Sequence, residues 1–108
     1  MKLVKIIVFV PSTHADLIRE TMGKAGAGKM GKYSYCTFTL KGKGRFFANK
    51  DADPTIGNPG EFTEVDEERI ETICPKNIAK KVIQEIKKVH PYEEVSLDIQ
   101  PLLTEEDL

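Results

Sequence analysis

Several residue types are scarce in this sequence. Its 108 residues include no tryptophan, only two cysteines and 7% aromatic residues. Two cysteines can neither form a disulfide framework nor alone supply the four ligands of a structural zinc site. No apolar run approaches the ~18 residues of a membrane-spanning helix, and 16 basic against 17 acidic residues leave no positive excess for a phosphate backbone. We therefore expect no disulfide-rich miniprotein, no membrane protein and no nucleic-acid-binding protein.

The length and composition favour a single small domain. The chain has room for one ordinary core, and 40% of its residues are hydrophobic. We assign residues 1–101 to the domain and residues 102–108 to an acidic, frayed C-terminal tail. The apolar run near the N-terminus is interrupted by Lys5 and is followed by no small-residue cleavage site, so it does not resemble a signal peptide. We therefore expect a cytoplasmic protein with both cysteines reduced.

Apolar residues at helical spacing indicate two amphipathic helices. The first follows Pro11 and ends at Gly26 and Gly28, because glycine readily adopts the left-handed conformation of a helix C-cap. The second follows Pro75 and ends at the His90-Pro91 pair, since proline restrains the residue before it. The stripes consist of Ala15, Ile18, Met22 and Ala25 in the first helix and of Ile78, Val82, Ile86 and Val89 in the second.

Clusters of β-branched and aromatic residues predict the strands. The expected strands are residues 2–10, 33–40, 45–48, 62–74 and 94–100. Residues 41–44 are interpreted as a turn, residues 49–60 as a loop and residues 66–68 as a break or bulge in the strand that contains them. This order predicts an α+β fold, a ferredoxin-like βαββαβ sandwich with an extra hairpin and loop in the middle. Both helices then cover one face of the sheet, and the uncovered face favours a homo-oligomer.

A glycine-rich segment lies between the first helix and the next strand. Its G-x4-G-K spacing is that of a P-loop, but Met30 stands where magnesium coordination needs serine or threonine. The segment also follows a helix, whereas a P-loop precedes one. A helix cap and tight turn is the simpler interpretation. The functional alternative is an anion or ligand site formed by backbone N–H groups and lysines; its candidate residues are Gly28, Lys29, Gly31 and Lys32, together with Tyr92.

Histidine, cysteine and glutamate side chains suggest two further kinds of chemistry. A divalent metal ion would be held by His90, Glu93 and Cys36, although no C-x-x-C or H-x-x-x-H spacing marks such a site. The alternative is that His90 only caps the second helix. A thiol enzyme would need Cys36 or Cys74 within reach of His90, and no local sequence signature supports this arrangement. We therefore expect no catalytic residues.

An ordered set of short motifs resembles a known family. Its members in this sequence are residues 26–33, Cys36-Thr37-Phe38, residues 42–46, Pro54-Thr55-Ile56-Gly57 with Gly60, Arg69-Ile70-Glu71 and residues 90–94. The set is similar to the CutA-like domain found within the Nif-three-like family, whose members are named GTP cyclohydrolase type 2 homologs. The resemblance implies a fold related to CutA and PII proteins and a trimer built through the middle strands, with a dimer as the alternative. It also implies that the host family's dinuclear metal site lies outside this chain.

The expected function is that of a small, oligomeric, non-enzymatic protein that binds a ligand or regulates a partner, as CutA and PII proteins do. The first alternative is a divalent-metal protein of the copper-tolerance type. The second, less favoured, is an enzyme that uses a thiol or a carboxylate.

Overall fold

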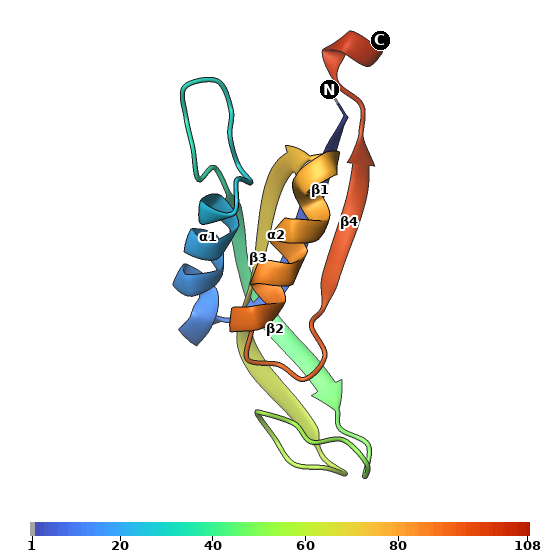
Figure 1. Ribbon diagram of the computed structural model, residues 1–108. Helices are drawn as coiled ribbons and strands as arrows, with labels where there is room; N and C mark the ends of the chain where they lie inside the picture. Colours follow the sequence, from blue (N-terminus) through green and yellow to red (C-terminus); the bar gives the residue numbers. More distant parts are fainter. Residues whose placement is uncertain (1) are drawn as a thin grey trace.

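The apolar run near the N-terminus forms the first strand of a four-stranded sheet in the computed structural model, which describes residues 2–108. The predicted βαββαβ order and the α+β ferredoxin-like class are confirmed. Two single turns of 3-10 helix, η1 and η2, supplement the main elements. The elements in chain order are β1 (Leu3–Pro11), η1 (Ser12–His14), α1 (Ala15–Lys24), β2 (Phe38–Phe47), β3 (Phe62–Pro75), α2 (Lys76–Val89), β4 (Leu97–Leu102) and η2 (Glu105–Asp107) (Figure 1).

The sheet has the strand order β2-β3-β1-β4, and all of its neighbouring strands are antiparallel. Its registers run without interruption, from Phe38 opposite Glu71 to Phe47 opposite Phe62 between β2 and β3. The predicted bulge at residues 66–68 is therefore wrong, because these residues keep an unbroken pairing with β1 or β2. Residues 43–47 of β2 and 62–66 of β3 extend beyond the pairing with β1 as a two-stranded arm (Figure 1). The longest dimension of the molecule is 49 Å.

The core lies between the sheet and the two helices, which cover the same face (Figure 1). Alternate residues of β1 point into it, as expected for a strand with one face on the core. Both predicted helical stripes supply its other side. The core residues include Val4, Ile6, Val8 and Val10 of β1, Ile18 and Met22 of α1, Ile70 and Cys74 of β3, and Val82 and Ile86 of α2. No helix within residues 2–108 combines the length and apolarity needed to cross a bilayer.

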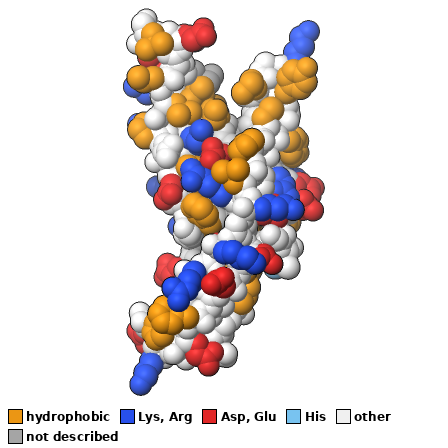
Figure 2. All heavy atoms as spheres, turned by 180° about the vertical axis from the view of Figure 1, so that it is seen from behind, with side chains coloured by type: hydrophobic (Ala, Val, Ile, Leu, Met, Phe, Trp, Pro, Cys, Tyr) orange, Lys and Arg blue, Asp and Glu red, His pale blue; other side chains and the backbone are white. Residues whose placement is uncertain are grey.

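The opposite face of the sheet has no covering layer, and Figure 2 views the molecule from that side. Thr39 accepts a hydrogen bond from Arg19 of α1, so its neighbours Phe38 and Leu40 point to the uncovered face. Phe38 is 63% exposed and Leu40 50% exposed. Charged side chains interrupt the apolar ones across this face. The predicted open face is therefore present, and its most exposed apolar residues lie on the edge strand β2.

The middle of the chain departs from the prediction. Residues 41–44 are not a turn but the centre of β2, so the predicted extra hairpin is a single strand. Glycine and lysine alternate with the period of a strand in this segment, and Lys43 pairs with Asp66 across to β3. At Gly44 an added Cβ would lie 2.1 Å from Oε1 of Glu67. A side chain at this position would displace the Glu67 carboxylate from the backbone of Gly44.

Two other boundaries also shift. Residues 33–37 precede β2 as part of an exposed loop in which Met30 and Tyr33 form an isolated bridge. β4 begins at Leu97 and ends at Leu102, later than predicted at both ends. The predicted frayed tail contains η2 instead, whose first turn is held by a reciprocal capping box between Thr104 and Asp107.

Candidate functional site

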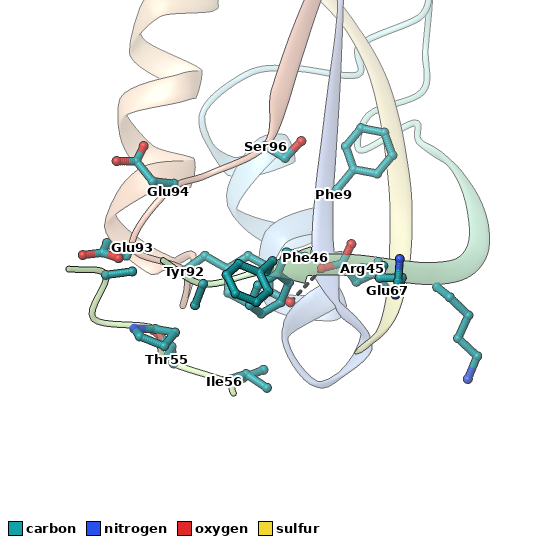
Figure 3. A pocket seen from close by; sticks show the side chains of 16 residues that line it. Phe9, Arg45, Phe46, Thr55, Ile56, Glu67, Tyr92, Glu93, Glu94 and Ser96 are labelled. Carbon is teal, nitrogen blue, oxygen red and sulfur yellow. Dashed lines mark hydrogen bonds between the residues drawn. The ribbon is translucent and has the colours of Figure 1, made fainter. Parts of the chain in front are cut away.

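A cleft of about 540 Å³ lies where the arm meets the segment between α2 and β4 (Figure 3). Its size is in the range of small-molecule sites. Three parts of the chain that are distant in sequence form it: the arm with its 48–61 loop, the end of β1, and residues 92–96. The lining residues are Phe9, Lys43, Gly44, Arg45, Phe46, Phe47, Ala48, Ala52, Pro54, Thr55, Ile56, Glu67, Tyr92, Glu93, Glu94 and Ser96.

Tyr92 and Glu67 form the polar centre of the cleft. The Tyr92 hydroxyl donates a hydrogen bond of 2.7 Å to Oε2 of Glu67 (Figure 3). The Tyr92 ring meets the Phe46 ring edge to face, with the centroids 6.3 Å apart. Burial and the neighbouring Glu67 carboxylate raise the pKa of the Tyr92 hydroxyl above its usual value, so it stays a donor.

His90 fixes the position of Tyr92. The His90 Nε2–H donates to the carbonyl oxygen of Phe9 at 2.8 Å, because a carbonyl can only accept. Nδ1 then accepts from the backbone N–H of Tyr92 at 3.1 Å. Both ring nitrogens are thus occupied in a neutral ring, which ties the end of α2 to β1. Burial lowers the pKa of His90, which favours this neutral form.

The 48–61 loop forms one wall of the cleft and is held in place by two hydrogen bonds. The Thr55 hydroxyl donates to the carbonyl oxygen of Pro91 at 2.6 Å. The backbone N–H of Asp53 donates to Oε1 of Glu93 at 3.2 Å. Both bonds connect the loop to the segment that follows α2. The loop predicted at residues 49–60 is therefore present, and it closes one side of the site.

The predicted metal ligands are not brought together within one chain. Glu93 lines the cleft and His90 lies beside it, bonded to the backbone of Tyr92. Cys36 lies beside Thr72, whose hydroxyl donates to the Cys36 carbonyl oxygen at 2.9 Å. Residues 2–108 contain no group of three or more histidine, cysteine, aspartate or glutamate side chains arranged to hold a metal ion. His90 also has no free ring nitrogen in this arrangement.

The predicted anion-binding residues are also separated. Gly28 is buried, and its N–H donates to the carbonyl oxygen of Ile73 rather than pointing to solvent. Lys29, Gly31 and Lys32 are exposed in the loop before β2. Tyr92 belongs to the cleft instead. Of these five residues, Tyr92 alone lines the cleft.

The two thiols lie apart from His90. Cys74 is buried in the core, and burial raises its pKa, which opposes thiolate formation. Cys36 contacts the carbonyl oxygen of Ser34 at 3.9 Å. Within the described residues, neither thiol has a hydrogen bond to a histidine, so the structure does not support a cysteine–histidine pair.

Sequence reasoning missed most of the cleft. Glu67 gave no local signal, because its role depends on which face of β3 it occupies. Arg45, Phe46 and Thr55 lie in motifs quoted for the family resemblance, but those motifs carry no chemistry by themselves. Within the segment from His90 to Glu93, sequence analysis proposed Tyr92 as a ligand-binding residue and His90 and Glu93 as metal ligands.

The stability of the protein is expected to fall as the pH drops below about 6.5, because His90 is held neutral in the folded state. The pKa of His90 is lower in the folded protein than in the unfolded chain. Between these two pKa values the unfolded chain binds a proton that the folded protein does not, so lowering the pH shifts the equilibrium toward unfolding. Urea unfolding at a series of pH values and fixed protein concentration measures the slope. His90→Gln should lose this slope, whereas His14→Gln, at the chain's other histidine, should keep most of it. An unchanged slope in His90→Gln would contradict the assignment.

Comparison with curated proteins identifies homologues. The chain is 48% identical over 103 residues to the GTP cyclohydrolase 1 type 2 homolog of Halalkalibacterium halodurans, a match that covers 95% of this chain and 28% of that protein. The corresponding protein of Bacillus subtilis is 45% identical over 100 residues, with 93% and 27% covered. This chain therefore spans about a quarter of the length of the curated relatives it matches. A scan against models of protein families finds no match.

Comparison with solved structures gives the same relationship and also finds more distant proteins that share the fold. A Bacillus cereus protein related to NIF3 matches with a TM-score of 0.79 and 43% identity, over 95% of this chain and 26% of that one. The periplasmic divalent cation tolerance protein CutA of Archaeoglobus fulgidus matches with a TM-score of 0.71 at 17% identity, over 96% and 89%. The Bacillus subtilis GlnK–ATP complex has a TM-score of 0.63 at 12% identity, over 94% and 82%. The predicted resemblance is thus confirmed: this chain is homologous to one segment of the NIF3-related GTP cyclohydrolase 1 type 2 homologs and has the CutA-like fold.

Proposed function

We propose that this chain is a non-enzymatic, homo-oligomeric module of the CutA and PII type that binds a small molecule in the cleft between the arm and residues 92–96. The observation that carries the proposal is the cleft itself. It combines aromatic walls, a hydrogen-bonded polar centre and the 48–61 loop, which a hydrogen bond holds in place; these are features of small-molecule sites. The cyclohydrolase activity in the relatives' name is not assigned to this chain, which spans about a quarter of their length.

The distribution of reactive groups supports a binding role over catalysis. A nucleophile needs a base within hydrogen-bond reach, and in the described residues Cys36 and Cys74 have no such partner. His90 is engaged through both ring nitrogens. Glu67 accepts a hydrogen bond from a tyrosine whose raised pKa makes it a poor general acid or base near neutral pH.

The uncovered sheet face supports self-association. Phe38 and Leu40 are exposed on that face beside the unpaired edge of β2. A second apolar group, Phe47 packed against Phe62 at 5.0 Å between centroids, is exposed toward the end of the arm. An edge strand with apolar neighbours is a surface that proteins cover by pairing with another chain. A trimer is the assembly we propose, and a dimer is the alternative.

Light scattering at micromolar concentration tests the assembly. The native protein is expected to show three times the 12.1 kDa mass of one chain. Leu40→Glu should lower this mass to that of a monomer, because it places a charge on the face we assign to the contact. Leu17→Glu is the matched control, since Leu17 is a comparably exposed leucine, at 44%, on α1. A monomeric native protein would count against the proposed function.

A further inference from the structure

We propose that the ligand of this cleft carries a planar, positively charged N–H donor group, such as an amidinium, a guanidinium or a protonated ring amine, which binds at Glu67 beside the aromatic rings of the cleft. This inference rests on the proposed function and specifies its ligand class. Four features of the cleft lead to it: the unpaired Glu67 carboxylate, the aromatic walls, the engagement of the nearby cations and the other carboxylates at the rim.

Glu67 is a carboxylate without a cation. Within residues 2–108, the ion pairs of β3 involve Asp66, Glu68 and Glu71, and none includes Glu67. The hydroxyl of Tyr92 donates to Oε2, and Oε1 lies over the backbone of Gly44. A half-buried carboxylate with a single neutral donor has unused acceptor capacity. A charged N–H donor would use this capacity and form the stronger, charge-assisted kind of hydrogen bond.

The walls beside Glu67 suit a flat cation. Phe46 and Tyr92 lie edge to face, and Phe9 also lines the cleft. A delocalised cation gains from the negative face of an aromatic ring, and more so when it is shielded from water. The same rings would bind the flat apolar body of the ligand. A compact, strongly hydrated ion would lose its water here without contacts of this kind.

The remaining charges of the cleft oppose an anion. Lys43 is neutralised by its ion pair with Asp66. The guanidinium of Arg45 stacks over Phe62, with Cζ 4.4 Å from the ring centroid. Glu93 and Glu94 add two further carboxylates at the rim. An anionic ligand would therefore meet more negative than available positive charge, whereas a cation complements the site.

A matched set of probes tests the charge preference. Benzamidine, benzamide and benzoate have similar shapes and carry positive, zero and negative charge. Each is titrated into the isotope-labelled native protein, and the backbone amide shifts of Tyr92, Glu93 and Thr55 report binding in the cleft. Benzamidine is expected to bind at least about tenfold more tightly than benzamide, because one charge-assisted hydrogen bond increases the affinity by about this factor. Benzoate should bind most weakly.

Two variants assign the preference to Glu67. Glu67→Gln should bind benzamidine and benzamide equally, because the amide keeps the shape and loses the charge. Glu71→Gln is the control: Glu71 lies on the same face of β3 but already pairs with Lys5 and Arg69, so the preference should persist. If all three probes bind the native cleft equally, or benzoate binds best, the ligand-class inference is wrong while the cleft remains a binding site. If no probe shifts the cleft amides, the proposed function itself fails.

Discussion

Replacing Gly28 with alanine is expected to lower the free energy of unfolding by about 3 kcal/mol, since strain and overpacking each contribute ~1–3 kcal/mol. Gly28 has φ of +78°, which disfavours any side chain. A Cβ built there would also lie 2.6 Å from the carbonyl oxygen and 2.7 Å from the nitrogen of Cys36. These are backbone atoms held by the Gly28–Cys36 hydrogen bond, so they cannot move aside easily.

Gly31→Ala separates the two causes of this loss. Gly31 also has a positive φ, at +56°, but nothing lies within 4 Å of the built Cβ. Its alanine variant should therefore lose only about 1 kcal/mol, the cost of the left-handed conformation alone. Chemical denaturation of both variants gives the comparison. Equal losses would mean that close packing at Gly28 contributes nothing.

Arg19→Met is expected to lower the free energy of unfolding by about 3 kcal/mol at neutral pH, because it leaves a buried carboxylate without its cation. Arg19 Nη1 donates to Oε1 of Glu68 at 2.8 Å, and the Glu68 side chain is only 8% exposed. This pair joins α1 to β3 at the base of the arm. The hydrogen bond from Arg19 is the main reason why the pKa of Glu68 lies below its usual value.

The pH dependence of this loss identifies its cause. In the native protein the lowered pKa of Glu68 adds stability above its unfolded value of 4.5, and that stability is lost as pH falls through the folded pKa. In Arg19→Met, desolvation is opposed only by the weaker effects of Ser12 and Lys41, so the pKa of Glu68 should rise. The difference in free energy of unfolding between the native protein and Arg19→Met should then decrease between about pH 7 and pH 5, where the buried carboxylate takes up a proton.

The matched control for this pair is Asp16→Ala. Asp16 is the second carboxylate that Arg19 contacts, at 2.6 Å, but its side chain is fully exposed. Its removal should cost at most ~1 kcal/mol, as for other surface ion pairs. A loss as large as that of Arg19→Met would show that the buried position of Glu68 is not what matters.

Much of the fold could be predicted from sequence because the spacing of apolar residues along each helix matches the face that packs on the core. The stripe from Ile78 to Val89 faces the core as predicted, and Pro75 and His90 mark the ends of α2. The turn predicted at residues 41–44 was wrong because alternating glycine and lysine have the composition of a turn but the period of a strand. Of the glycines in this segment, Gly44 alone has a contact that accounts for a glycine, because Glu67 of the partner strand lies over it.

The site was less predictable for a physical reason. A cleft depends on which distant segments the fold brings together, and a single sequence contains no direct signal of this. His90 illustrates the point. Its position after a helix suggested either a cap or a metal ligand. The lone pair of Nδ1, which a metal would need, accepts from the backbone N–H of Tyr92, and Nε2–H donates to the carbonyl of Phe9. That contact joins residues separated by most of the chain.

The pairing of Leu3 with Leu102 has a consequence for architecture. These residues are direct partners in the register of β1 and β4, so the chain enters and leaves the domain on adjacent strands. Neighbouring strands lie only ~5 Å apart. Both ends lie at the top of Figure 1, away from the arm and the cleft. A domain with this geometry can be inserted into a surface loop of a larger protein without separating the residues on either side of the insertion. This geometry agrees with the comparisons, in which the chain matches about a quarter of the length of each curated relative.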